Sequence, residues 1–220
     1  MAALKYWVWL TALPGLSNRS RLLLLERYSS PEDVYYADAE ELALTEGLTP
    51  GQAQLLSDKS LTRADRILAD CARGDIFLLT MQDAAYPARL RDIFDPPVLL
   101  YGKGSLPLFD EEAAIAVVGT RSCTPYGLRC AHRMGYELAR QGAVVVSGMA
   151  KGIDGAAMRG ALQAGGFTAA VLGGGVDVVY PAENRRLYED IAATGVLLSE
   201  YPPGTEPLPG HFPVRNRIIS

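Results

Sequence analysis

The chain has 220 residues, of which 49% are hydrophobic and 21% charged, with a formal net charge of −4. This apolar content is ample for a packed core and excludes a wholly disordered chain. The acidic balance argues against a general polyanion binder, so nucleic-acid binding would need a local cluster of arginines. Arginine does outnumber lysine, which occurs four times. A GC-rich genome would produce the same bias.

Cysteine and histidine are too sparse to indicate a metal centre. The three cysteines and two histidines match no zinc spacing, and this usage favours a reducing cytoplasm. The apolar start of the chain is short and lacks a cleavage site of small residues, and no apolar run reaches membrane-spanning length. We therefore expect a cytoplasmic protein without a metal, a cofactor or a membrane partner.

The first 73 residues are predicted to form a small all-helical domain. Apolar residues recur there at helical spacing. Ser30 followed by Pro31 is a helix start signal, and Asp38 is expected to cap the next helix. Helices are predicted over 4–12 and 19–28, from Pro31, from Asp38 through Leu44, from Thr49 through Ser57, and over 60–73 with an end at Gly74.

Residues 74–220 are predicted to form a Rossmann-like α/β domain. Short apolar runs alternate with helical segments, which indicates a mostly parallel sheet with helices on both faces. The run 143–146 is apolar throughout, as expected for a strand covered on both sides. The Pro- and Gly-rich stretch 200–213 is expected to be an extended loop. Strands are predicted over 76–79, 98–101, 115–118, 143–146, 167–172 and 195–199, and helices over 125–141, 153–164 and 183–193.

The loop after the third predicted strand has features of an anion site. Ligands of open parallel sheets bind beyond the carboxyl ends of the strands. Thr124 and Pro125 open a helix there, whose free N–H groups favour an anion. Arg121 is placed to contact a phosphate. The segment Gly119-Thr120-Arg121-Ser122 is neither a dinucleotide-binding nor a Walker motif, so a generic strand–turn–helix connection remains the alternative.

Two further loops are rich in glycine. Ser147, Gly148 and Lys151 follow the next strand, and Lys151 would add a second phosphate contact if it is not simply a solvated charge. Asp154 is expected to cap the following helix. Gly174 lies in a run of three glycines that lets a ligand approach the backbone, although a tight turn without a ligand is equally consistent with it.

The last ten residues place an aromatic side chain beside two arginines. Phe212 with Arg215 and Arg217 is the combination that stacks a base while holding backbone phosphates, unless the ring fills the core and the arginines are surface charges. The loops together offer no nucleophile with an adjacent base and no pair of carboxylates. The residues therefore favour phosphate or nucleic-acid binding over catalysis.

Several strings in the same order and spacing resemble the DNA-processing protein A (DprA/Smf) family. They cover the chain from about residue 75 to its last residue. They are Gly119-Thr120-Arg121 with Tyr126-Gly127, Ser147-Gly148-x-Ala150-x-Gly152-Ile153-Asp154, Gly173-x-Gly175-x-Asp177 with Tyr180-Pro181-x-x-Asn184, and Ser199-Glu200-Tyr201-Pro202-Pro203-Gly204 with His211-Phe212-Pro213-x-Arg215-Asn216-Arg217-Ile218-Ile219.

This resemblance implies a non-enzymatic protein that binds and protects single-stranded DNA and helps load RecA recombinase in natural transformation. It implies a DNA pocket formed by Arg121, Phe212 and Arg215 and bordered by Ser147, Gly148 and Lys151. It also implies a homodimer for the full-length protein. The N-terminal helices look like the family's small domain, similar to SAM or helix-hairpin-helix modules, with turns at 13–16 and 47–49.

The sequence departs from the family pattern at three positions and in length. Met158 stands where a histidine is common, and Leu208 and Val214 replace basic residues. These changes lower the local positive charge. The chain stops where family members continue, so we expect a fragment or a truncated product with an exposed sheet edge.

The alternative function is that of a LOG-like nucleotide phosphoribohydrolase from the related Rossmann group. Those enzymes carry Pro-Gly-Gly-x-Gly-Thr-x-x-Glu, whose glutamate acts on the nucleotide. The comparable glycines here run from Gly173 to Gly175 without that threonine or glutamate.

Overall fold

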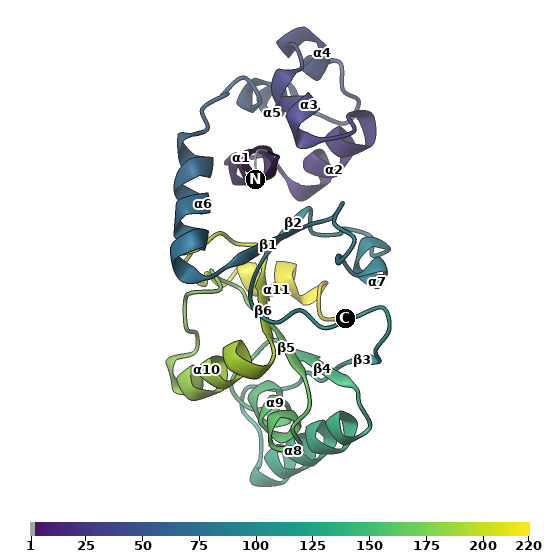
Figure 1. Ribbon diagram of the computed structural model, residues 1–220, viewed down its shortest axis with the longest axis vertical. Coiled ribbons are helices and arrows are strands. Elements are labelled where there is room, and N and C mark those ends of the chain that lie inside the picture. The colour runs from purple at the N-terminus through teal and green to yellow at the C-terminus, as the bar shows by residue number, and fades with distance from the viewer. Residues whose placement is uncertain (1–2) are drawn as a thin grey trace.

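The computed structural model describes residues 3–220. An N-terminal helical segment precedes an α/β part built on a six-stranded sheet, and α6, the last helix of this segment, leads into β1 of the sheet (Figure 1). The helical segment consists of α1 (Leu4–Ala12), α2 (Asn18–Arg27), α3 (Pro31–Tyr36), α4 (Ala39–Ala43), α5 (Pro50–Leu55) and α6 (Thr62–Gly74).

The predicted capping residues behave differently from one another. The hydroxyl of Ser30 accepts a hydrogen bond from a backbone amide in the first turn of α3, as expected, and the hydroxyl of Thr49 does the same for α5. Asp38 stands before α4 but its side chain makes no capping hydrogen bond, so that prediction is wrong. The left-handed residue that ends α6 is Asp75, at φ 52°, and Gly74 is still helical.

The two turns that resemble helical hairpins have the backbone expected of such turns. Gly15 and Gly47 both adopt φ 86°, a conformation that residues with a Cβ rarely adopt. A Cβ on Gly47 would lie 2.7 Å from Leu23 Cδ1, so this turn also packs closely on a helix. Glycine is favoured at both positions by the left-handed backbone that these turns need.

The sheet has the strand order β1-β2-β6-β5-β4-β3. Strands β3 to β6 are parallel neighbours, whereas β1 pairs antiparallel with β2, and β2 pairs antiparallel with β6. The prediction of a mostly parallel, Rossmann-like sheet is confirmed, with two antiparallel strands added at one edge. The bounds are Phe77–Thr80 (β1), Leu99–Gly104 (β2), Ala114–Ala116 (β3), Val144–Ser147 (β4), Thr168–Val171 (β5) and Val196–Ser199 (β6).

The long helices cover one face of the sheet. These are α8 (Pro125–Arg140), α9 (Ile153–Gln163) and α10 (Arg185–Thr194), which lie at the lower end of Figure 1. Helices α8 and α9 approach so closely that a Cβ on Gly135 would overlap the carbonyl of Ala157. The opposite face is covered by shorter pieces: α7 (Ala88–Arg91), which the sequence did not predict, residues 105–112, and the residues after α11 (His211–Asn216).

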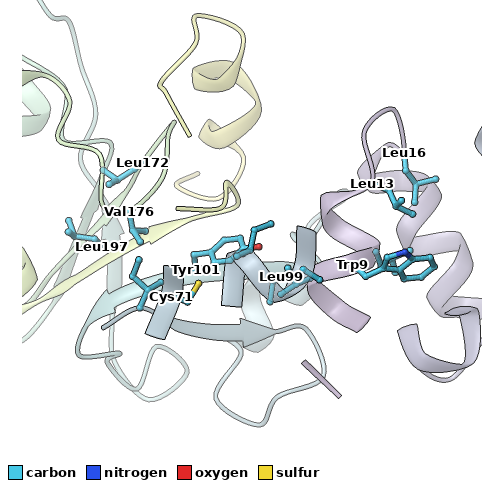
Figure 2. Close-up of a cluster of buried hydrophobic side chains, with 14 of the residues drawn as sticks. Trp9, Leu13, Leu16, Cys71, Leu99, Tyr101, Leu172, Val176 and Leu197 are labelled. Carbon is cyan, nitrogen blue, oxygen red and sulfur yellow. The ribbon is translucent and has the colours of Figure 1, made fainter. Parts of the chain in front are cut away.

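One hydrophobic cluster joins the helical segment to the sheet. It contains Trp9 of α1, Leu13 directly after α1, Tyr101 of β2 and Leu197 of β6 (Figure 2). This cluster contains residues from both the helical segment and the sheet, so the two parts share one core. The domain boundary at 73/74 therefore stays a prediction. Because β3 to β6 run parallel, their carboxyl ends lie at one rim of the sheet.

The predicted loop over 200–213 is partly wrong. Helix α11 begins at His211, inside that range. The His211 ring stacks on Tyr201, with ring centroids 3.9 Å apart, and its Nδ1 lies 2.9 Å from the carbonyl oxygen of Gly173. These contacts hold α11 against the glycine loop that follows β5.

Candidate nucleic-acid interface

Loops from four parts of the chain enclose a pocket at the carboxyl ends of the strands. The pocket has a volume of about 180 Å³. Six of the eleven predicted site residues line it: Arg121, Gly148, Lys151, Gly174, Phe212 and Arg215. The other residues of its wall are Ala150, Leu172, Gly173, Val178, Tyr180, Pro181 and Pro207.

Arg121 and Phe212 meet at this pocket although they are far apart in the sequence. The guanidinium carbon of Arg121 lies 5.2 Å from the centroid of the Phe212 ring, a cation–π contact. Arg121 is exposed, and the ring rests against Gly173, where a Cβ would lie 2.9 Å from Phe212 Cδ1. The pair therefore presents a charged group and a flat apolar surface side by side.

Arg215 has a different environment from Arg121. It is only 5% exposed, and its Nη1 donates hydrogen bonds to the carbonyls of Gly148, at 3.1 Å, and Val171. Burial lowers its pKa from the usual arginine value, but an arginine remains charged. Its guanidinium carbon lies 5.9 Å from the Phe212 ring. Arg215 thus ties α11 and its phenylalanine to the loop after β4.

Two backbone amides in the loops after β3 and β4 are already hydrogen-bonded within the chain. The Asp154 carboxylate accepts hydrogen bonds from the amides of Gly119, at 3.1 Å, and Gly148, at 3.2 Å. It makes no capping hydrogen bond to α9, so the predicted capping role is wrong. An internal carboxylate therefore occupies the anion position between these two loops.

Five predicted site residues do not line the pocket. Gly119 is exposed and its amide donates to Asp154, and Ser147 is fully buried, with its hydroxyl donating to the carbonyl of Val117. Thr120 and Ser122 hydrogen-bond to each other in a local turn. Contact of these residues with nucleic acid stays a prediction, and their present partners favour structural roles.

Arg217, the fifth of these residues, is bound to two carboxylates away from the pocket, and its contact with nucleic acid also stays a prediction. Both of its terminal nitrogens reach the Glu200 carboxylate at 2.6 Å, and its Nε lies 3.0 Å from Asp95 Oδ2. Asp95 also accepts a hydrogen bond from Asn18 of α2. Arg217 therefore connects the C-terminal residues to the helical segment, and its guanidinium is already engaged by two carboxylates.

Lys151 lies at the rim of the pocket, where it forms an ion pair with Glu183. The lysine and glutamate side chains are 53% and 63% exposed. The hydrogen bond from Lys151 lowers the pKa of Glu183, so the carboxylate is ionised at neutral pH. Lys151 is thus not a freely solvated charge, and a phosphate would meet its ammonium group already paired with Glu183.

Sequence reasoning did not assign Tyr180 to the site. Its ring centroid lies 5.7 Å from that of Phe212, and the residue is 45% exposed. An exposed aromatic that follows a glycine-rich loop is the signal that points to it. Two aromatic rings therefore flank the same pocket.

Comparison with known proteins gives the family. Residues 77–220 match the family described as DNA recombination-mediator protein A. The chain belongs to this family. The family resemblance stated from the sequence motifs is thereby confirmed, and the matched region contains every residue of the pocket.

Curated relatives in this family are similar over part of their length. The DNA processing protein DprA of Bacillus subtilis is 41% identical over 155 residues, 70% of this chain and 52% of the relative. That of Streptococcus pneumoniae is 49% identical over 138 residues, 63% of this chain and 48% of the relative. Protein Smf of Synechocystis is 34% identical over 98% of this chain and 55% of the relative. The chain spans about half the length of these relatives.

Two solved structures of recombination-mediator proteins resemble this fold. The S. pneumoniae DprA structure has a TM-score of 0.81 and 36% identity, covering 98% of this chain and 74% of that one. It confirms the fold across both the helical segment and the sheet. A DNA processing protein A structure from Helicobacter pylori, described for its single-stranded DNA binding mode, has a TM-score of 0.58 and 35% identity over 64% of each chain.

Proposed function

We propose that this protein binds single-stranded DNA in the pocket between Arg121 and Phe212. The observation that carries the proposal is the exposed Arg121 guanidinium lying 5.2 Å from the centroid of the Phe212 ring, over backbone glycines. Non-specific single-strand binders combine a cation for the phosphodiester with an aromatic face for the base. The related H. pylori protein, described for its single-stranded DNA binding, supports the same ligand class.

The pocket favours binding without catalysis. Within residues 3–220 the side chains that line it include no carboxylate, histidine, hydroxyl of serine or threonine, or thiol, and the two that could act as an acid or base are Lys151, which is paired with Glu183, and Tyr180. General acid–base or nucleophilic chemistry needs such groups within hydrogen-bonding reach of a substrate. The carboxylate at the rim of the pocket, that of Glu183, is paired with Lys151, and this disfavours the LOG-like phosphoribohydrolase, whose reaction depends on a glutamate. Incubation with nucleoside monophosphates and chromatography for free base tests that alternative.

The acidic net charge is compatible with this ligand because the cations gather locally. Arg121 and Lys151 lie at the pocket, and Arg215 lies beneath it. A single strand is flexible and carries one charge per phosphate, so a short positive surface is enough to orient it. Binding should therefore weaken as salt is added.

A fluorescence-anisotropy titration with labelled oligo-dT at two salt concentrations tests the proposal, with duplex of the same length as the control. Arg121→Ala and Phe212→Ala should each weaken binding about 5- to 100-fold, which is about 1–2.7 kcal/mol and lies within the range for the loss of one stacked base. Arg140→Ala is the matched control, because Arg140 is an exposed arginine in the last turn of α8. Wild-type affinity in both pocket variants would refute this binding site.

The cellular role that we propose is protection of incoming single-stranded DNA and assistance in loading RecA recombinase during natural transformation. We also propose that the full-length protein is a cytoplasmic homodimer. RecA ATP hydrolysis on DNA coated with single-strand-binding protein measures loading, and Arg121→Ala should reduce the stimulation. Light scattering of the full-length protein measures the dimer. Within the described residues, no helix is long and apolar enough to cross a membrane.

A further inference from the structure

An ion pair closes one side of the proposed DNA pocket. Lys151 comes from the loop after β4, and Glu183 comes from η1 (Ala182–Asn184), the short helical turn before α10. Lys151 and Pro181, two residues before the glutamate, both line the pocket. The carboxylate therefore lies at the edge where a bound strand would approach the lysine.

Buried contacts hold the two segments together, so the pairing is not an accident of two long side chains. Asn184 is 3% exposed, and its Nδ2 donates to the carbonyls of Met149, at 2.9 Å, and Ala150, at 3.3 Å. These bonds tie η1 directly to the residues that precede Lys151. Glu183 is thus kept next to the lysine by the backbone around it.

Glu183 is an anion among cations. Arg185 and Arg186 follow it and are exposed, and the exposed Arg159 donates a hydrogen bond to Asn184 Oδ1 at 3.3 Å. Without the carboxylate, positive charge would continue from the pocket over the start of α10. With the carboxylate present, the charge of Lys151 is neutralised and an approaching phosphate meets a negative charge.

We propose that Glu183 limits the affinity of the pocket by competing with DNA phosphate for Lys151. This inference rests on the proposed function. A phosphodiester that binds Lys151 must displace the carboxylate, and both anions cannot keep the same lysine contact. Glu183 is therefore an affinity-setting residue, and its removal strengthens DNA binding.

The test compares oligo-dT affinities of wild type, Glu183→Gln, Lys151→Met and the double variant by anisotropy at two salt concentrations. Glu183→Gln should bind about 2- to 5-fold more tightly, the range expected from exposed ion pairs of up to about 1 kcal/mol. Its affinity should fall more steeply with salt, by about 0.7 in the logarithmic slope, because one more phosphate contact forms. In the Lys151→Met background the gain should disappear.

A matched control separates this effect from a general loss of negative charge. Glu137→Gln removes an exposed carboxylate from α8, 12 residues or about 18 Å along the helix from Pro125. It should leave the affinity unchanged. Both glutamates are exposed, so all variants should keep the wild-type melting temperature.

The possible results distinguish failure of the proposed competition from failure of the proposed function. Equal affinity of wild type and Glu183→Gln, with wild type binding oligo-dT, overturns the competition while leaving the proposed function intact. A gain that persists with Lys151→Met, or that Glu137→Gln reproduces, also overturns it. Absence of oligo-dT binding by every variant refutes the proposed function, and the competition with it.

Discussion

The carboxylate of Asp154 accepts the backbone amide hydrogen of Gly148, with 3.2 Å between oxygen and nitrogen, while its other oxygen accepts that of Gly119. In nucleotide-binding α/β proteins, amides at the carboxyl ends of strands and at helix N-termini receive ligand phosphate. Here a residue of the chain satisfies them. The proposed DNA pocket lies beside this position, toward α11, and would depend on side chains more than on free backbone amides.

Replacement of Asp154 should destabilise the fold. Asp154→Ala removes the acceptor of two amides and an opposite charge near Arg215. We expect a loss of about 1–3 kcal/mol in the free energy of unfolding, measured by urea titration. Asp190→Ala, which removes an exposed aspartate on α10, should stay within about 0.5 kcal/mol of wild type. Equal stability of the two variants would contradict this role for Asp154.

Tyr180 should contribute its ring to DNA binding. Tyr180→Ala should weaken oligo-dT binding about 5- to 100-fold, while Tyr180→Phe should bind like wild type because it keeps the stacking surface. Phe94→Ala provides the comparison, since Phe94 is an aromatic residue with 92% exposure in a loop that does not line the pocket. Loss of binding by Tyr180→Phe would show instead that the hydroxyl is needed.

Arg217 should matter for stability and not for affinity. Arg217→Met leaves Glu200, which is 15% exposed, without its partner, and we expect a cost of about 2–3 kcal/mol in urea unfolding. The folded variant should bind oligo-dT within about twofold of wild type, which is a difference of about 0.4 kcal/mol. Arg121→Ala should show the reverse pattern. Weak binding by a stable Arg217→Met protein would restore Arg217 to the DNA site.

Cys71 should make stability depend on alkaline pH. Burial, chiefly, raises the pKa of its thiol from 9.0 to about 11. The folded state thus holds a proton that the unfolded state releases, so this stabilisation is complete below pH 9 and is lost as the pH rises through 11. The loss should reach about 3 kcal/mol. Unfolding of wild type and Cys71→Ala at several pH values measures it, since the tyrosines common to both cancel. Parallel pH profiles would contradict the assignment.

The sequence by itself was sufficient for the order of the elements apart from α7 and α11, and for the rim where the candidate site lies. Apolar runs such as 143–146 indicate strands that are buried on both faces, because the pattern of apolar residues along a segment reflects which of its faces are buried. The antiparallel pairing of β1 and β2 could not be predicted in this way, because the apolar pattern of a short strand does not show whether it runs parallel or antiparallel to its neighbour. Helix α11 was missed because the Pro- and Gly-rich residues before it dominated that stretch.

Only the tertiary structure decided which polar residues of the site are available. Arg121, Arg215 and Arg217 have the same chemistry in sequence, yet one is exposed, one is buried against backbone carbonyls and one pairs with Glu200 and Asp95. Lys151 likewise pairs with Glu183, a residue far from it along the chain. Hydrogen-bond partners are set by the packing of distant segments, and local sequence carries no record of that packing.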